Sequence, residues 1–373
     1  MTSQKTQSIV VRVHAGPYRR EGCPVELAVP WPSEALIQLQ RQGIRRPEPC
    51  QLFRRRGQTY VCWLVDRLRA GASATYILTC GGRRRRAKAR VRTDRLGPTR
   101  LHTVTQRRQI GVLRLERGWF CPFWSPLRTP TGHSITAEPS PGELLKGPAA
   151  PPTGLWIAPP YAAATNAVEV ELMAPVAWSN GPVFSVVELL QRWSWGAEAL
   201  ECRVRYKLYA ATARWWLLDV EAMFVGRYGR VQLERSEAHA VLNLRLVPAL
   251  WLAHAARLQT PLGPLEPAAL SRCALPWVDL SGLSGGRWIG VMIMLPPKAC
   301  AHEPWFVGTH GTVTVGGWGK GRWVELAPGQ QHVFRARLCI HAGDAGRIGC
   351  NERYADYGFP PQMEILEGTD HTG

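Results

Sequence analysis

Short apolar runs that alternate with polar positions recur along the whole chain, and they predict strands rather than helices. Residues 25–29 alternate cleanly, residues 60–65 and 75–80 follow, and residues 168–172 and 202–209 carry charges on one face. Alternation with a period of two, bounded by turn residues, is typical of half-buried strands. Many such segments in succession predict an all-β protein built from packed antiparallel sheets.

One run is apolar on both of its faces. Residues 288–294 follow a turn-rich stretch that carries Trp277 and Asp279, and the proline pair at 296–297 ends them. A strand that is apolar on both faces is covered on both faces. We therefore expect this segment at the centre of a large β core.

The strand pattern divides the chain into parts of different size. We expect a small N-terminal β module, a basic linker, a large antiparallel β-sandwich domain and a tail, at residues 8–92, 93–108, 109–358 and 359–373. A chain of 373 residues is long enough for one large domain and a smaller one. The 30 prolines and 36 glycines suit short strands joined by turns.

Three segments allow a second interpretation. In residues 32–42, Ala35, Leu36 and Leu39 share a helix face behind Ser33, so a short helix is an equal alternative to a strand. Residues 248–258 predict a short helix. Within the predicted tail, residues 363–366 can add an edge strand.

The formal charge of +18 is dominated by arginine, and much of it lies in the first third of the chain. Residues 83–86 are four consecutive arginines, and further arginines follow as far as Arg100. Such a segment can bind nucleic acid through its phosphates. It lacks interleaved aromatic residues and any nucleic-acid motif, so we expect a solvated linker; nucleic-acid association through residues 83–100 is the disfavoured alternative.

The ten cysteines are scattered without a CxxC pair. Cys62 and Cys339 lie in apolar strand-like runs, where a free thiol behaves as a small core hydrophobe. The apolar run at residues 9–11 is too short for a signal peptide, and the longest run falls short of the ~20 residues of a membrane helix. We expect a reduced, cytoplasmic protein without a membrane partner. No HExxH or HxH pattern occurs, so no metal and no cofactor is predicted.

Short motifs occur in a fixed order between residues 118 and 343. They include Phe123-Trp124-Ser125-Pro126, Gly154-Leu155-Trp156, Trp277-Val278-Asp279-Leu280-Ser281-Gly282, His302-Glu303-Pro304-Trp305 and His341-Ala342-Gly343. In this order they resemble a bacterial family of unknown function that is often labelled "methane oxygenase" automatically. The resemblance implies a β-sandwich of the jelly-roll or sugar-epimerase-like supersandwich kind, and carbohydrate substrates.

The chain departs from that family at one point. Members of the family carry a His-His pair just before the Gly-Leu-Trp motif, whereas this chain has Pro-Ala-Ala-Pro-Pro-Thr at residues 148–153. Imidazoles bind metals and exchange protons near neutral pH. Both capacities are absent at this point of the chain. The label also evokes a membrane-spanning subunit, and no apolar stretch here is long enough to span.

The candidate site residues follow from the resemblance and from the side-chain chemistry. They are Asp279 and His302 for orienting or exchanging protons with a sugar hydroxyl, and Arg245, Trp305, Trp277 and His341 for binding the ligand. Arg245 would neutralise charge, although a structural pair with Asp219 is its alternative. Asp279 has an alternative role as the anchor of an Asx-type turn.

Sixteen tryptophans offer flat faces that stack on sugars or fill a core. Because Pro304 and the loop histidines His302 and His310 flank Trp305, we expect Trp305 to be exposed as the stacking platform. The sequence predicts a protein that binds or processes a carbohydrate or sugar derivative in a concave site. A catalytically inactive scaffold of the same family is the alternative, and whether the protein catalyses a reaction stays open.

Overall fold

The computed structural model describes residues 6–81, 88–116, 121–138, 153–158, 169–195, 198–234, 240–300, 303–317 and 323–371. The chain forms two compact units. Unit 1 consists of Met1–Val91, Asn180–Phe184 and Asn351–Gly373, and unit 2 consists of Arg92–Ser179 and Ser185–Cys350. Each unit is built from antiparallel sheets, which confirms the predicted all-β sandwich fold.

Unit 1 contains a four-stranded sheet in the order β26-β1-β6-β3 and a three-stranded sheet in the order β2-β5-β4. Its strands are β1 (Thr6–His14), β2 (Arg20–Ala28), β3 (Ile37–Arg41), β4 (Cys50–Arg55), β5 (Gln58–Leu68), β6 (Ser73–Cys80) and β26 (Gln362–His371). Alternate residues of both sheets form its core, in which the rings of Trp63 and Tyr76 lie 5.6 Å apart.

Unit 2 contains an eight-stranded sheet in the order β22-β23-β18-β11-β10-β9-β8-β7. Its strands are β7 (Val91–Arg95), β8 (Arg100–Thr105), β9 (Arg108–Arg114), β10 (Phe123–Leu127), β11 (Leu155–Ile157), β18 (Leu242–Arg245), β22 (Trp305–Val307) and β23 (Thr312–Val315).

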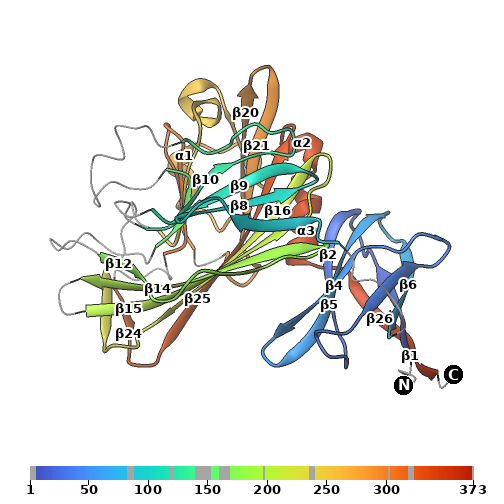
Figure 1. Cartoon of the computed structure of the whole chain (residues 1–373). Coiled ribbons are helices and arrows are strands. Elements are labelled where there is room, and N and C mark those ends of the chain that lie inside the picture. Colours follow the sequence, from blue (N-terminus) through green and yellow to red (C-terminus); the bar gives the residue numbers. More distant parts are fainter. Residues whose placement is uncertain are drawn as a thin grey trace. The chain divides into compact units, whose positions relative to one another are not determined.

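The second large sheet of unit 2 follows the order β12-β14-β15-β16-β25-β21-β20-β19, with β13 paired to β14 (Figure 1). Its strands are β12 (Glu169–Leu172), β13 (Ala177–Ser179), β14 (Phe184–Trp195), β15 (Glu198–Tyr209), β16 (Trp215–Val225), β19 (Arg257–Gln259), β20 (Trp277–Ser284), β21 (Arg287–Met294) and β25 (Gln331–Ala342). A separate pair joins β17 (Val231–Glu234) to β24 (Trp323–Leu326).

The two large sheets pack face to face. The indole of Trp124 on β10 meets the ring of Tyr206 on β15 edge-on at 5.5 Å, and the Trp216 indole N–H donates to the Arg128 carbonyl at 2.8 Å. Even-numbered residues of β15 and β16 therefore point into the core, and odd-numbered residues point to the outer face of this sheet.

The central position predicted for residues 288–294 agrees with the structure. Strand β21 pairs with β20 on one side and with β25 on the other. Its residues from Ile289 to Met294 are buried on both faces of the sheet. Cys62 and Cys339 are also buried in strands, as expected, and all ten thiols are free.

Several local predictions differ from the structure. Residues 37–41 form strand β3 instead of a helix, because pairing with β6 and the burial of Leu39 outweigh local helix spacing. Residues 248–258 form only two 3₁₀ turns, η2 (Pro248–Leu250) and η3 (Leu252–His254), before β19. The described part of the chain contains three short α-helices, α1 (Pro267–Leu270), α2 (Ala345–Ile348) and α3 (Cys350–Gly358).

The predicted linker and tail are also strands. Strands β7 and β8 occupy most of residues 93–108, and within the predicted tail β26 (Gln362–His371) is an edge strand of unit 1. The edge strand considered at residues 363–366 is therefore present within β26. The arginine run at residues 83–86 lies outside the described residues.

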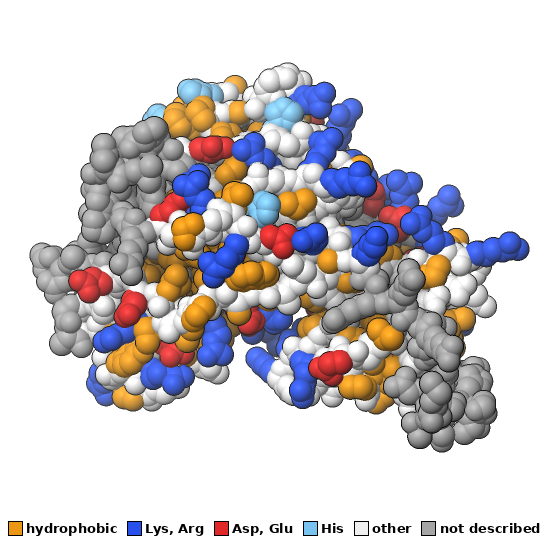
Figure 2. All heavy atoms as spheres, in the orientation of Figure 1, with side chains coloured by type: hydrophobic (Ala, Val, Ile, Leu, Met, Phe, Trp, Pro, Cys, Tyr) orange, Lys and Arg blue, Asp and Glu red, His pale blue; other side chains and the backbone are white. Residues whose placement is uncertain are grey.

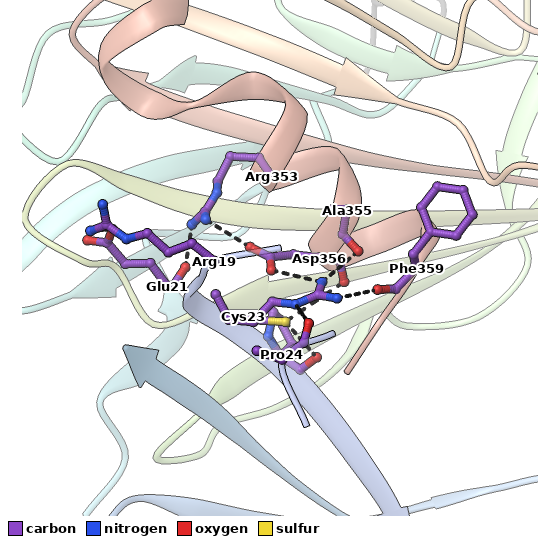
Figure 3. A network of polar contacts seen from close by, with 10 residues as sticks. Arg19, Glu21, Cys23, Pro24, Arg353, Ala355, Asp356 and Phe359 are labelled. Carbon is purple, nitrogen blue, oxygen red and sulfur yellow. Dashed lines mark hydrogen bonds and ion pairs between the residues drawn. The ribbon is translucent and has the colours of Figure 1, made fainter. Parts of the chain in front are cut away.

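A buried polar network anchors the C-terminal segment within unit 1 (Figure 3). Arg20 donates from Nη1 to the Ala355 carbonyl at 2.8 Å, from Nη2 to the Phe359 carbonyl at 2.8 Å and from Nε to the Ala15 carbonyl at 2.9 Å. The last carbonyls of a helix lack intrahelical partners and attract a cation. Arg20 therefore caps the end of α3 from strand β2.

The same network contains a carboxylate between two guanidinium groups. Asp356 lies 3.3 Å from Arg20 Nη1 and 3.1 Å from Arg353 Nη2, and all three side chains are at most 4% exposed. Burial raises the pKa of Asp356 to about 6, although Arg353 and Arg20 act to lower it. None of these three residues was a candidate from the sequence.

Candidate functional site

Two of the predicted site residues meet in the nine-stranded sheet. His341 Nε2 lies 2.8 Å from Asp279 Oδ2, and His341 Nδ1 lies 2.9 Å from the carbonyl oxygen of Gly343. Because a carbonyl only accepts, Nδ1 carries a proton. The contact between Nε2 and Oδ2 then holds one shared proton, as an imidazolium–carboxylate pair or as a neutral imidazole and a carboxylic acid.

A glycine in the middle strand makes this contact possible. The register aligns Ser281 on β20, Gly290 on β21 and His341 on β25. A Cβ atom at Gly290 would lie 2.4 Å from His341 Cε1, so only glycine lets the imidazole cross β21 towards Asp279. Asp279 thus lies inside a strand, and its side chain anchors a cross-strand contact rather than a turn.

The pair is sealed from solvent. Asp279 and His341 are 0% exposed, and the one-turn helix α2 packs near β20. Within the described residues, Asp279 Oδ1 and Ser281 Oγ are buried without a hydrogen-bond partner. In this conformation a dissolved ligand cannot reach the pair. Titratable pairs of this kind are nevertheless common in reactive sites.

Asp219 has a different partner from the one proposed from the sequence. Arg337 donates from Nε to Asp219 Oδ1 at 2.5 Å and from Nη2 to Oδ2 at 2.8 Å, and the Tyr209 hydroxyl donates to Oδ2 at 2.9 Å. The register places Asp219 directly opposite Arg337. Arg245 lies in the other sheet, so the proposed Asp219–Arg245 pair is absent.

The structure places both predicted tryptophans in the core. Trp305 is 1% exposed and donates its indole N–H to the Leu275 carbonyl at 2.9 Å, and Trp277 is 3% exposed. Alternation along β22 turns Trp305 inward and Phe306 outward, where Phe306 is 43% exposed. Trp305 therefore presents no face for stacking. His302 lies outside the described residues.

A partly exposed tryptophan lies elsewhere in unit 2. The ring of Trp251 lies 5.1 Å from the imidazole of His254 and 5.5 Å from that of His310, and both imidazoles are exposed. The Trp251 indole N–H donates to the Leu246 carbonyl at 2.9 Å. This bond anchors one edge of the indole, and the ring contacts two imidazoles, which come from η3 and from the loop between β22 and β23.

Glycine holds Trp251 against that loop. Gly311 has a φ of +76°, which favours glycine, and a Cβ atom there would lie 2.3 Å from Trp251 Cδ1. The Ala253 amide also donates to the Thr309 carbonyl at 3.1 Å. Turn η3 and the β22–β23 loop are therefore tied together at the point where Trp251 packs.

Arg245 and Phe306 lie at the same end of the eight-stranded sheet. Arg245 is opposite Thr312, and the Gly308 amide donates to the Thr312 carbonyl, so the three residues form one cross-strand row. A Cβ atom at Gly308 would lie 3.5 Å from Phe306 Cε1, which places the phenyl ring beside this row. Neighbouring strands are about 4.8 Å apart, so the row spans about 10 Å.

We call this surface the rim site. It consists of Arg245, Trp251, His254, Phe306 and His310. Arg245 and His310 were considered from the sequence, whereas Trp251, His254 and Phe306 were not. The sequence does contain a signal for one pair: Trp251 and His254 are three residues apart in a short apolar segment. This spacing puts the two rings on one side of a 3₁₀ turn.

The described residues hold no group of three or more His, Cys, Asp or Glu side chains arranged to bind a metal ion. Burial raises the pKa of the Cys50 thiol to about 12, and it raises that of Cys202 further, so these thiols stay protonated and unreactive near neutral pH. No described helix has the length and apolarity that crossing a membrane requires.

The fold and the surface features define a two-unit all-β protein whose larger unit is an antiparallel sandwich. The chain belongs to DUF6807, a family of unknown function, whose model matches residues 119–355. This match agrees with the resemblance to an uncharacterised family. No curated protein sequence matches the chain.

Solved structures of larger glycoside hydrolases are weakly similar to this chain. They include a family 38 glycosyl hydrolase protein from Enterococcus faecalis (TM-score 0.42, 10% identity, 98% of this chain and 48% of that one). An α-mannosidase from Enterococcus faecalis V583 gives a TM-score of 0.42 at 10% identity over 100% of this chain and 47% of that chain. A family 36 α-galactosidase from Geobacillus stearothermophilus gives 0.35 at 13% identity over 66% and 40%. The chain spans about half the length of the first two, and likeness at this level says nothing about its activity.

Proposed function

We propose that this protein binds a carbohydrate or a sugar derivative, and that the rim site is the binding surface. The observation that carries the proposal is the partly exposed Trp251 ring, fixed by its own N–H bond and flanked by the exposed imidazoles of His254 and His310. An indole offers a flat apolar face to the C–H face of a sugar ring. Imidazole and guanidinium groups beside it can exchange hydrogen bonds with sugar hydroxyls.

The exposure of the rim residues supports this surface over the other candidates. His254, Phe306, His310 and Arg245 are all exposed, and they come from three segments that backbone hydrogen bonds tie together. Binding sites combine aromatic surface with a few well-placed polar groups. The Asp279–His341 pair has the chemistry but no access, and the Asp219–Arg337 pair already satisfies its own hydrogen bonds.

We propose binding rather than a reaction because the only proton-sharing pair among the predicted site residues in the described part of the chain is sealed. A catalytic role for Asp279, alone or with His302, would require the buried pair to become accessible to a ligand. The structure supplies no observation that favours nucleic-acid association, since the arginine run lies outside the described residues.

The test is a titration of the full chain with a panel of oligosaccharides, by calorimetry and by ligand-observed NMR. The variants Phe306→Ala and His310→Ala remove exposed rim side chains, and Tyr228→Ala is the matched control. Tyr228 is 44% exposed, close to the 43% of Phe306, but lies outside the rim site. We expect each rim variant to weaken binding at least about tenfold, which is about 1.4 kcal/mol, and the control to bind like the wild type.

Two results would overturn the proposal. One is the absence of binding to every member of the panel. The other is equal weakening by Tyr228→Ala and by the rim variants, which would show that the loss does not depend on this surface.

A further inference from the structure

The rim site carries cation-capable side chains without acidic partners. Arg245, His254 and His310 make no ion pair with any described residue. Some other arginines of unit 2 are paired: Arg335 Nε lies 2.6 Å from Glu221 Oε2, and Arg205 Nε lies 3.2 Å from Glu188 Oε1. Arg245 is therefore an exposed guanidinium that no described carboxylate neutralises.

Carboxylates are also scarce in the segments that build the rim. Between residues 240 and 258, and between residues 303 and 315, the only acidic residue is Glu303. Glu303 is 8% exposed and accepts a hydrogen bond from the Gly317 amide at 2.6 Å, so its charge is already engaged in the interior. Glu138 follows Ala137, whose amide donates to the Arg245 carbonyl, but the Glu138 carboxylate lies 3.1 Å from Arg128 Nη2. Arg245 therefore has no ion pair with a described residue.

The net charge of +18 alone would not single out this place. Lys and Arg side chains are spread over the visible face of the molecule (Figure 2). The rim site combines Arg245, which has no ion pair with a described residue, with the Trp251 and Phe306 rings at one end of the eight-stranded sheet. Arg245 and Phe306 point to the same face, because Leu244 and Trp305 next to them are buried.

We infer that the ligand of the rim site is an acidic carbohydrate, with its anionic group on Arg245 and a sugar ring on Trp251; this inference rests on the proposed function. A guanidinium binds a carboxylate or a sulfate through two parallel N–H bonds, which is stronger and more specific than a neutral contact. The row from Arg245 to Gly308 spans about 10 Å. Phe306 lies beside the Gly308 end of this row, and Trp251 donates to the carbonyl of Leu246, the residue after Arg245. A disaccharide has a length similar to that of the row.

The test compares ligands that differ only in charge. An oligogalacturonate is titrated against its fully methyl-esterified form, and a sulfated galactan oligomer against its unsulfated parent, at low and at high salt. We expect each acidic form to bind at least about tenfold more tightly than its neutral counterpart at low salt. The advantage should shrink at high salt, because ions screen exposed charges.

Arg245→Gln should remove this preference, so that each acidic form binds no more tightly than its neutral counterpart. Arg46→Gln is the control, since Arg46 is exposed and has no ion pair with a described residue of either unit. Preference for the uronate alone or for the sulfate alone supports the inference and identifies the source of the charge. Equal binding of charged and neutral forms, with Arg245→Gln unaffected, overturns the inference and leaves the proposed function standing. Failure of all four ligands and of the oligosaccharide panel overturns both.

Discussion

The substitution Arg20→Met tests whether the buried network holds the C-terminal segment within unit 1. Methionine fills much of the space of the arginine stem but cannot donate hydrogen bonds. The change removes the guanidinium donor to the Ala15, Ala355 and Phe359 carbonyls, of which Ala355 keeps the bond from the Phe359 amide, and it removes one of the two cations beside Asp356. Unit 1 should therefore lose stability while unit 2 keeps its own.

The magnitude follows from the burial of the network. Arg20 is 2% exposed and Asp356 is 4% exposed, so neither group is solvated. Removing one partner of a buried ion pair costs about 3–5 kcal/mol, and each buried carbonyl left unpaired costs about 1–3 kcal/mol. We expect a loss of about 3–5 kcal/mol, because these costs overlap and the smaller side chain lets the site relax.

Hydrogen–deuterium exchange of the full chain, read by mass spectrometry, separates the two units. A loss of 3 kcal/mol corresponds to a population of the open state more than about 100-fold larger. Exchange in peptides from β1 and β5 should accelerate by that factor, while exchange in β21 should not change. Arg46→Met is the exposed control. Acceleration below about threefold in β1 and β5, which is about 0.7 kcal/mol, would refute the reasoning.

Three further predictions concern single positions. Gly311→Ala places a Cβ atom 2.3 Å from Trp251 Cδ1 at a φ of +76°, so it should displace the indole and weaken oligosaccharide binding at least about tenfold in calorimetry; unchanged affinity would exclude Trp251 as the platform. Gly290→Ala places a Cβ atom 2.4 Å from His341 Cε1 and should break the buried pair. The free energy of unfolding of unit 2, measured by thermal unfolding, should fall by about 3–5 kcal/mol. A loss below about 1 kcal/mol would show that the surrounding structure adjusts to the added methyl group at little cost. Burial raises the pKa of Asp356 from 3.8 to about 6, so folded unit 1 binds the proton more tightly than the unfolded chain. The stability contributed by this group is full below about pH 4 and is lost as the pH rises to about 6, by on the order of 3 kcal/mol. Urea unfolding at a series of pH values should show this trend for the wild type and not for Asp356→Asn. The same pH dependence of the free energy of unfolding in both proteins would contradict this prediction.

The β architecture could be predicted because it depends on local alternation. Strand β21 was identified from its apolar run alone, since a strand covered on both faces needs apolar residues at every position. The helix considered at residues 32–42 shows the limit of local patterns. Leu39 is buried against the unit 1 core in strand β3, and a distant strand, β6, decides the conformation of the segment.

The site residues depended on sheet register, which local patterns do not contain. Asp279 and His341 are 62 residues apart in sequence and meet only because Gly290 lies between them in the sheet. The register also places Asp219 opposite Arg337, so Asp219 pairs with Arg337 and not with Arg245. A shift of one residue exchanges the two faces of a strand, and this is why Trp305 is buried while its neighbour Phe306 is exposed.

Long-range contacts explain the incorrect prediction of a C-terminal tail. Arg20 and Ala355 are 335 residues apart, and β26 pairs with the first strand of the chain. Alternation within residues 363–366 indicated an edge strand there. The local pattern, however, did not identify the sheet to which this strand belongs.

The most direct test of the central claim is the response of the Trp251 indole N–H in a ¹H–¹⁵N NMR titration of the full chain with an oligosaccharide, assigned with the variant Trp251→Phe. We predict a saturable shift of the Trp251 signal and no shift of the buried Trp305 signal. Saturable binding that leaves the Trp251 signal in place would contradict the claim that the sugar stacks at the rim site.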